Sequence, residues 1–315
     1  MTRIGLLLLT ALASAQERPA DNAIFSTGVA LVHVDVEVTD GTRLITGFRK
    51  DDFRILDNNA PQKILYFSQE EEPLDIILLF DVSGSMAPKL ERLRDSAHAA
   101  FAELRSGDRV AVMTFAGRTQ LAAPFTDDLD AAERTILNDV LNRTRGGTHI
   151  LGAINAATQI FLREPRTQRR RAILIVTDNH GQPSGHRETT VRNLWEADAV
   201  LSGLQIRARG ETATLNIGRV ISPAAAFMNA ESMTGVAEQT GGDLLKGDEP
   251  GEEFRELIRR MRLRYSLYYA MPAGKPGEQR KLKITLTDEA QKKNPQGRVR
   301  ARSGYTIPKA AKAGA

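Results

Sequence analysis

Three oxygen-bearing side chains stand at every second position directly after an apolar run. Asp81, Ser83 and Ser85 follow residues 76–80, which read Ile-Ile-Leu-Leu-Phe. An unbroken apolar run of this length is typical of a strand that is buried on both faces of a sheet. Carboxylate and hydroxyl oxygens suit hard cations such as Mg²⁺. The turn therefore predicts the core of a cation site, although serines that follow a strand also serve as helix caps.

Two further polar residues follow the same logic later in the chain. Thr148 stands after two glycines and before a helical pattern, and Asp178 ends the apolar run 172–177. In a parallel sheet, ligands bind at the carboxyl ends of the strands, so both loops are expected to open on the same edge as Asp81. We therefore expect oxygen donors from three separate loops to converge on one ion.

This set of residues resembles the metal-ion-dependent adhesion site of the von Willebrand factor A (VWFA) domain. That site is written Asp-x-Ser-x-Ser, with a Thr and an Asp from two later loops. The matching metal-site residues here are Asp81, Ser83, Ser85, Thr148 and Asp178. The resemblance implies a bound Mg²⁺, with Mn²⁺ or Ca²⁺ as alternatives. It also implies a protein partner whose acidic side chain fills an exchangeable position on the ion, which is adhesion and not catalysis.

Short stretches outside this motif resemble the bacterial family of VWFA-related proteins first defined in Acidobacteria. They are Asp51-Asp52-Phe53, Pro73-Leu74, Thr240-Gly241-Gly242 and Arg302-Ser303-Gly304-Tyr305. The resemblance implies that one VWFA domain is flanked by further segments on both sides.

Strand and helix patterns alternate through the middle of the chain. Further apolar strands are expected at 110–115 and 172–177, with helical spacing at about 88–104, 129–141 and 150–162. This alternation predicts an α/β domain with a doubly wound, mostly parallel sheet that helices cover on both faces. The later part predicts helices at 189–199 and 231–239, strands at 204–207 and 213–217, and an inserted loop at 222–229.

The segments on either side of this domain have β character. Residues 29–38 alternate between apolar and polar side chains, as do residues 282–286 near the end of the chain. Such alternation predicts strands with one buried face. Neither segment has enough strands to bury both of its faces alone, so we expect the two to pair into one β-sandwich with the α/β domain inserted between them.

The expected domain organisation has four parts. It comprises a signal peptide at 1–15, an N-terminal β module at 24–72, a VWFA domain at 74–262 and a C-terminal β module at 263–307. The signal peptide is expected from an early basic residue, an apolar run and the small-residue sequence Ala-Ser-Ala. No other apolar segment approaches the ~18 residues that a membrane span needs. The mature protein is therefore expected to be exported and soluble, either periplasmic or extracellular.

Enzymatic interpretations have weaker support in the sequence. A Mg²⁺-dependent hydrolase or phosphatase could use Asp81 as its nucleophile, but dehalogenase-like phosphatases usually carry a second Asp where this chain has Ser83. No Gly-x-Ser-x-Gly elbow surrounds Ser85, which disfavours a Ser-His-Asp hydrolase. The glycine spacing of a dinucleotide site is also absent. We predict a binding module that is not an enzyme, with the Mg²⁺-dependent hydrolase as the alternative.

Histidines and arginines in the loops need a separate interpretation. His149, His180 and His186 are expected near the cation, either as solvated loop residues, which we favour, or as groups for pH tuning or a transition metal. Arg166 and the run 169–171 could contact an anionic partner, but we favour a solvated loop at the opposite edge of the sheet. The net charge is only +4 and there is no cysteine, which excludes disulfides and thiolate metal sites. No stacking aromatics accompany the basic run, so a nucleic-acid partner is not expected.

Overall fold

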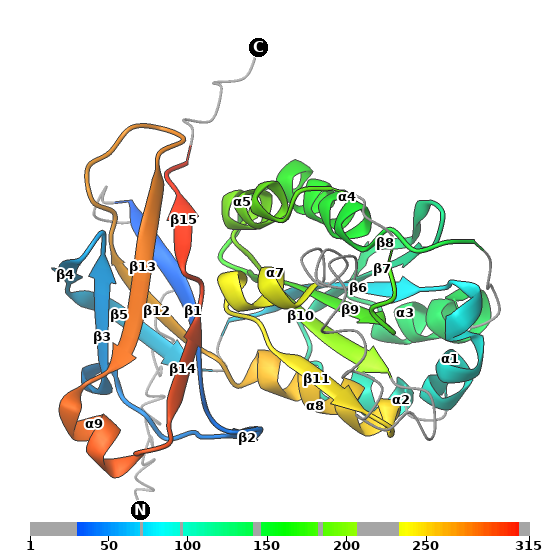
Figure 1. The fold of residues 1–315 in the computed structure, drawn as a ribbon, viewed down its shortest axis with the longest axis horizontal. Helices are drawn as coiled ribbons and strands as arrows, with labels where there is room; N and C mark the ends of the chain where they lie inside the picture. The colour runs from blue at the N-terminus through cyan, green and yellow to red at the C-terminus, as the bar shows by residue number, and fades with distance from the viewer. Residues whose placement is uncertain are drawn as a thin grey trace, which may run out of the picture. The chain divides into compact units, whose positions relative to one another are not determined.

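The computed structural model describes residues 30–69, 72–94, 97–140, 146–181, 185–206 and 233–308. The expected signal peptide, the strand at 213–217 and the loop at 222–229 lie outside these residues. A compact unit begins at Leu31, and its described strands form three sheets (Figure 1). No described helix is both long and apolar enough to span a membrane.

The largest sheet contains six strands in the order β11-β10-β9-β6-β7-β8. Their bounds are β6 (Leu74–Asp81), β7 (Arg109–Phe115), β8 (Thr119–Thr126), β9 (Arg170–Thr177), β10 (Ala199–Ile206) and β11 (Leu244–Gly247). All neighbours are parallel except β8, which runs antiparallel to β7 at one edge. The mostly parallel α/β sheet expected from the sequence is confirmed, whereas β8 was not expected. Pro124 within β8 fits an edge strand, because proline has no N–H to donate to a second neighbour.

The strand β6 is buried on both faces. Ile76, Leu78 and Phe80 belong to one hydrophobic cluster, and Ile77 and Leu79 belong to the cluster on the other face. The first cluster includes side chains of α1 (Ala87–Arg94), α2 (Ala97–Phe101), α3 (Leu129–Thr135) and α8 (Pro250–Arg262), and the second those of α4 (Ile150–Arg163), α5 (Arg187–Ala197) and α7 (Met233–Thr240). Full burial of one such side chain stabilises the fold by about 1.5–3 kcal/mol. The strand that ends in Asp81 therefore lies inside the α/β domain, with helices on both sides of its sheet (Figure 1).

Some expected helix boundaries differ from the observed ones. The helix expected at about 88–104 corresponds to α1 and α2, and the one expected at 129–141 continues from α3 into a π-helical turn at Ile136–Val140. The helix expected at 189–199 ends at Ala197, because Asp198 adopts a left-handed conformation with φ of 55°. A left-handed residue of this kind commonly terminates a helix, and β10 starts directly after it.

Two smaller sheets combine strands from both flanks of the α/β domain. One has the order β14-β1-β12-β5 with β2 beside β1, and the other has the order β15-β13-β3-β4. The bounds are β1 (Leu31–Asp40), β2 (Arg43–Leu44), β3 (Phe53–Asp57), β4 (Ala60–Gln62), β5 (Ile64–Gln69), β12 (Tyr265–Ala270), β13 (Gln279–Leu286), β14 (Arg298–Ala301) and β15 (Gly304–Thr306). A short helix, α9 (Asp288–Lys293), lies between β13 and β14.

A shared core and a buried carboxylate hold these two sheets. Side chains from both sheets belong to one hydrophobic cluster. Asp57, which is fully buried, accepts hydrogen bonds from the hydroxyls of Tyr269 and Tyr305 at 2.8 and 2.9 Å. It also accepts one from Nε of Arg280 at 2.6 Å. Burial and the contact with Asp57 raise the pKa of Tyr305 to about 12, so its hydroxyl stays a donor at neutral pH.

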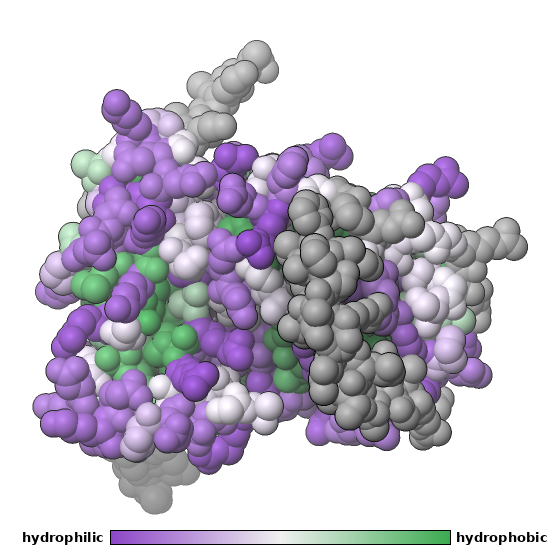
Figure 2. Space-filling view, viewed as in Figure 1, coloured by the Kyte–Doolittle hydropathy of each residue, from purple (hydrophilic) through white to green (hydrophobic). Residues whose placement is uncertain are grey.

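Hydrophobic surface is unevenly distributed over the molecule. Figure 2 shows that the hydrophobic residues visible on this face gather mainly over the two smaller sheets. Among the described residues, the large hydrophobic side chains that are exposed are Leu65 and Tyr66 on β5 and Leu121 on β8. Both β5 and β8 are edge strands, so no other described strand pairs with one side of each.

Buried ion pairs connect the amino end of the α/β sheet to β1. Arg170 is 3% exposed, and its Nε donates to Oδ1 of Asp35 at 2.6 Å. Its Nη2 donates to the carbonyl of Met261 in α8 at 2.7 Å. The expectation that 169–171 forms a solvated loop is therefore wrong, since Arg170 and Arg171 are buried within β9 and Arg169 pairs with Asp75. Arg170 pairs with Asp35, Arg169 shares Asp75 with Arg109, and Arg171 donates to backbone carbonyls.

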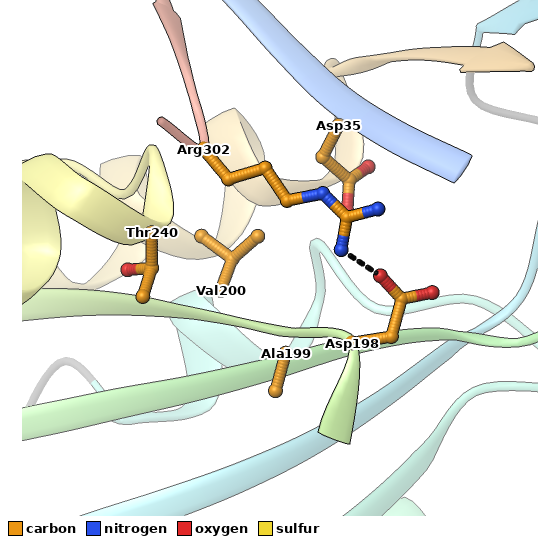
Figure 3. Close-up of a pocket in the computed structure, with 6 residues that line it drawn as sticks. All are labelled: Asp35, Asp198, Ala199, Val200, Thr240 and Arg302. Atoms are coloured by element: carbon orange, nitrogen blue, oxygen red, sulfur yellow. Dashed lines mark hydrogen bonds and ion pairs between the residues drawn. The ribbon is translucent and has the colours of Figure 1, made fainter. Parts of the chain in front are cut away.

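A second charged group lies beside this contact. His33 on β1 lies 3.7 Å from Asp35 and 3.5 Å from Asp198. Arg302 donates to Oδ1 of Asp198 at 2.6 Å, and Figure 3 shows the Arg302 guanidinium pointing toward that carboxylate. Burial acts to lower the pKa of His33, but the charge of Asp35 and the hydrogen bond and charge of Asp198 outweigh it and raise the pKa above its ordinary value of 6.5.

His33 is expected to make folding stability depend on pH near neutrality. Because its pKa is raised in the folded state, its stabilising contribution is fully present below pH 6.5 and is lost as the pH rises through the folded pKa. Asp35 and Asp198 have lowered pKa values despite burial, so their contributions are lost only as the pH falls below about 3.8. We expect the free energy of unfolding to decrease from about pH 6 to pH 8, and to decrease less in His33→Asn. Urea unfolding at several pH values measures this free energy for both proteins. An equal dependence on pH in the wild type and in His33→Asn would refute the prediction.

Candidate metal centre

The carboxyl end of β6 fixes the first part of the site. Asp81 is fully buried, and its Oδ1 accepts a hydrogen bond from the backbone N of Ser83 at 2.9 Å. Its Oδ2 accepts one from the hydroxyl of Thr177 at 2.6 Å. The chain then enters a short 3₁₀ helix (Gly84–Met86) and α1, and the hydroxyl oxygens of Ser83 and Ser85 lie 3.3 Å apart. Asp81 is therefore positioned by its own turn and by the adjacent strand β9, and Thr177 is a positioning residue that the motif does not predict.

Asp178 reaches the same corner from β9. The strands β6 and β9 are parallel neighbours, with Phe80 opposite Val176, so Asp81 and Asp178 leave the sheet at the same edge. Asp178 is 2% exposed, and its Oδ1 accepts from the backbone N of His180 at 3.1 Å. It directly follows Thr177, whose hydroxyl donates to Asp81. The structure thus brings the turn after β6 and the turn after β9 into contact.

The segment that carries Thr148 lies against these loops. Thr148 is 4% exposed and comes just before α4. A β-carbon placed on Gly181 would lie 3.5 Å from the carbonyl oxygen of Thr148 and 2.9 Å from the side chain of Ile150. Similarly, a β-carbon on Gly146, whose φ is 95°, would lie 3.1 Å from the backbone N of Gly117. The segment is therefore packed between the loops that follow β7 and β9, at the carboxyl edge of the sheet.

A buried lysine also faces this corner. Lys89 in α1 is 8% exposed, and its Nζ donates to Oδ2 of Asp178 at 2.7 Å. The motif does not predict Lys89. The available sequence signal is its position four residues after Ser85, which places it about one helical turn further along the chain.

The two carboxylates differ in their electrostatic environment. Burial raises the pKa of Asp81 and the charge of Asp178 raises it further, although hydrogen bonds from Thr177 and Ser83 act in the opposite direction. Burial also acts to raise the pKa of Asp178, but the hydrogen bonds from His180, Lys89 and Ser85 outweigh it and hold the pKa well below its usual range. The charge of Asp178 is therefore compensated, while that of Asp81 is not fully so. A cation beside Asp81 would offset the cost of burying its negative charge near that of Asp178.

The donor set fits a hard cation. His180 has its Nδ1 3.4 Å from Oδ1 of Asp178, while His149 and His186 stand at the N-caps of α4 and α5 without a capping hydrogen bond from their side chains. Within the described ranges, no group of three or more His, Asp or Glu side chains could hold a metal ion. A cation here would depend on serine and threonine hydroxyls together with the two carboxylates, a set that suits Mg²⁺, Mn²⁺ or Ca²⁺.

The fold and this corner define a class of protein. A family model described as the von Willebrand factor type A domain matches residues 76–182, which extend from β6 to the loop after β9. Residues 76–182 therefore match a von Willebrand factor type A domain, as the motif predicted. Domains of this class typically mediate protein interactions. The narrower resemblance to the family first defined in Acidobacteria stays a prediction.

Several solved structures are similar to this chain. A conserved hypothetical protein, BatB, from Bacteroides thetaiotaomicron is 21% identical with a TM-score of 0.44, and the match covers 60% of this chain and 97% of that one. A von Willebrand factor type A protein from Catenulispora acidiphila is 13% identical with a TM-score of 0.48, over 90% and 74% of the two chains. Proximal thread matrix protein 1 of the mussel byssus, solved with a zinc-occupied MIDAS motif, is 17% identical with a TM-score of 0.45, over 67% and 50%. No curated protein matches the sequence.

Proposed function

We propose that this protein is exported and binds a partner protein through a divalent cation. The residues proposed to hold the cation are Asp81, Ser83, Ser85, Thr148 and Asp178. The observation that carries this proposal is the hydrogen bond from the hydroxyl of Thr177, at the end of β9, to Asp81, at the end of β6, at 2.6 Å, with Asp178 the next residue after Thr177. It joins two strand ends that the sequence separates by 96 residues.

The chemistry of these donors favours binding to a partner. Hydroxyls of Ser83, Ser85 and Thr148 can bind Mg²⁺ without neutralising it, and the carboxylates can orient those hydroxyls. A bound Mg²⁺ keeps several exchangeable waters, so a carboxylate from a partner protein can replace one of them. Both oxygens of Asp81 accept hydrogen bonds, which restrains the group and does not favour a role as a nucleophile.

We also propose that the two smaller sheets form a β-sandwich into which the α/β domain is inserted. In this proposal the modules at 24–72 and 263–307 together make a scaffold, or a second contact surface, for the domain at 74–262. The mixed strand order and the shared hydrophobic cluster support this arrangement. Export rests on the expected signal peptide.

Capture from the native cell envelope tests the proposed function. The purified mature protein is incubated with envelope extract in Mg²⁺, in EDTA, and in EDTA followed by excess Mg²⁺. We expect a partner that is retained in Mg²⁺, released by EDTA and recovered when Mg²⁺ is restored. A matched bait carrying Asp130→Ala, which removes an exposed carboxylate in α3, is expected to behave like the wild type. Undiminished capture in EDTA would contradict the proposal.

A further inference from the structure

The buried lysine of the candidate metal centre has no role in the proposed function so far. A lysine is rarely buried unless its charge is paired, and Lys89 is 8% exposed with its ammonium on Asp178 at 2.7 Å. This places a positive charge against one of the carboxylates that the cation would need. Lys89 is therefore part of the site itself.

The hydrogen bonds of Asp178 show what this contact does. Oδ2 of Asp178 accepts from the ammonium of Lys89, and Oδ1 accepts from the backbone N of His180. Both oxygens are thus engaged, and the contact with Lys89 connects the loop after β9 to α1. The hydrogen bond from Thr177 to Asp81 connects the end of β9 to the end of β6. The corner is held together by contacts within the chain alone.

The same contact opposes a divalent cation. An incoming Mg²⁺ would meet the ammonium of Lys89 at Asp178, and two positive charges at short separation repel strongly inside a protein. A lysine ammonium is a point charge on a flexible four-carbon stem, so it can leave the carboxylate without a change in the backbone.

We propose, on the basis of the proposed metal site, that Lys89 is an internal cation that a divalent metal must displace from Asp178. Metal binding is then an exchange of cations. Lys89 keeps the corner assembled in the absence of metal and lowers the affinity of the site for it.

Calorimetric titration with Mg²⁺ or Mn²⁺ alone tests this proposal. We expect Lys89→Met to bind the metal about tenfold more tightly than the wild type, because the competing charge is gone. Lys63→Met removes the same charge from an exposed position between β4 and β5, and it is expected to leave the affinity within about twofold of the wild type.

Thermal unfolding separates this role from a merely structural one. Without metal, Lys89→Met is expected to unfold at a lower temperature than the wild type, since Asp178 loses its partner. Saturating Mg²⁺ is expected to raise the unfolding temperature of Lys89→Met by more than it raises that of the wild type. A lysine with only a structural role would, when removed, lower both the stability and the metal affinity. Lys89→Gln keeps a hydrogen-bond donor without the charge and is the second variant if Lys89→Met does not fold.

The metal titrations distinguish a failure of the proposed cation exchange at Asp178 from a failure of the proposed function. If the wild type binds metal and Lys89→Met or Lys89→Gln binds it equally or more weakly, the exchange is overturned and the metal site stands. If only the Lys89 variants bind metal, the exchange is supported and the metal-dependent function of the wild type fails. If no protein binds metal, both proposals fail.

Discussion

Asp81→Ala is expected to weaken the affinity for Mg²⁺ by about a hundredfold or more and to abolish cation-dependent capture of a partner. Alanine removes a carboxylate that both the backbone N of Ser83 and the hydroxyl of Thr177 hold in place. It leaves those two donors unpaired, which costs about 1–3 kcal/mol each. The buried strand β6 is otherwise unchanged, so we expect the variant to fold. Calorimetry measures the metal affinity, and circular dichroism checks the fold.

Thr148 offers a matched pair of variants for the same site. Thr148→Ala removes the hydroxyl from a buried position in the segment before α4, and we expect it to lose Mg²⁺ binding as Asp81→Ala does. Thr148→Ser retains the hydroxyl and is expected to retain binding. Normal Mg²⁺ affinity in either Asp81→Ala or Thr148→Ala would remove the five-residue site from consideration.

Arg170→Met is expected to lower the free energy of unfolding by about 3–5 kcal/mol. The substitution leaves Asp35 buried without its main partner and also removes the hydrogen bond to the carbonyl of Met261. Replacing both members of a buried ion pair with apolar side chains costs far less than removing one, so Arg170→Met with Asp35→Leu is expected to recover much of the loss. Urea unfolding measures both proteins.

Arg166→Met provides the control for this prediction. Arg166 lies four residues earlier and is exposed, so its loss is expected to cost less than about 1 kcal/mol. A similar small cost for Arg170→Met would show that the contact with Asp35 contributes little to stability.

Much of the α/β domain could be predicted because its signals are local. The apolar run before Asp81 and the helical spacing that follows depend on neighbouring residues, and both are confirmed. The strand β8 lacks this signal, since its sequence Thr-Gln-Leu-Ala-Ala-Pro-Phe-Thr does not alternate cleanly and contains a proline. Its position at the sheet edge, with only one neighbour, makes such a sequence acceptable.

The charged contacts could not be predicted because their partners are distant in sequence. Arg170 looks like part of a solvated basic run until Asp35, 135 residues earlier, is placed beside it. Lys89 looks like a surface residue of an amphipathic helix until Asp178, 89 residues later, is found at its ammonium. Sequence patterns show which residues are charged, but only the fold shows which charges meet.

The strand order has a consequence for the order in which parts of the chain fold. β1 takes β12 and β14 as its neighbours, and the amide of Phe48 bonds the hydroxyl of Tyr265, 217 residues away. During synthesis the first strands emerge long before their neighbours exist, whereas β6 to β10 complete their pairing within a shorter stretch. Because distant pairings are slow to form, we expect the two mixed sheets to close last, after the final fifty residues have been synthesised. A chain that stops before Tyr265 would lack β12 and β14 and would leave β1 paired only with the two-residue strand β2 among the described strands.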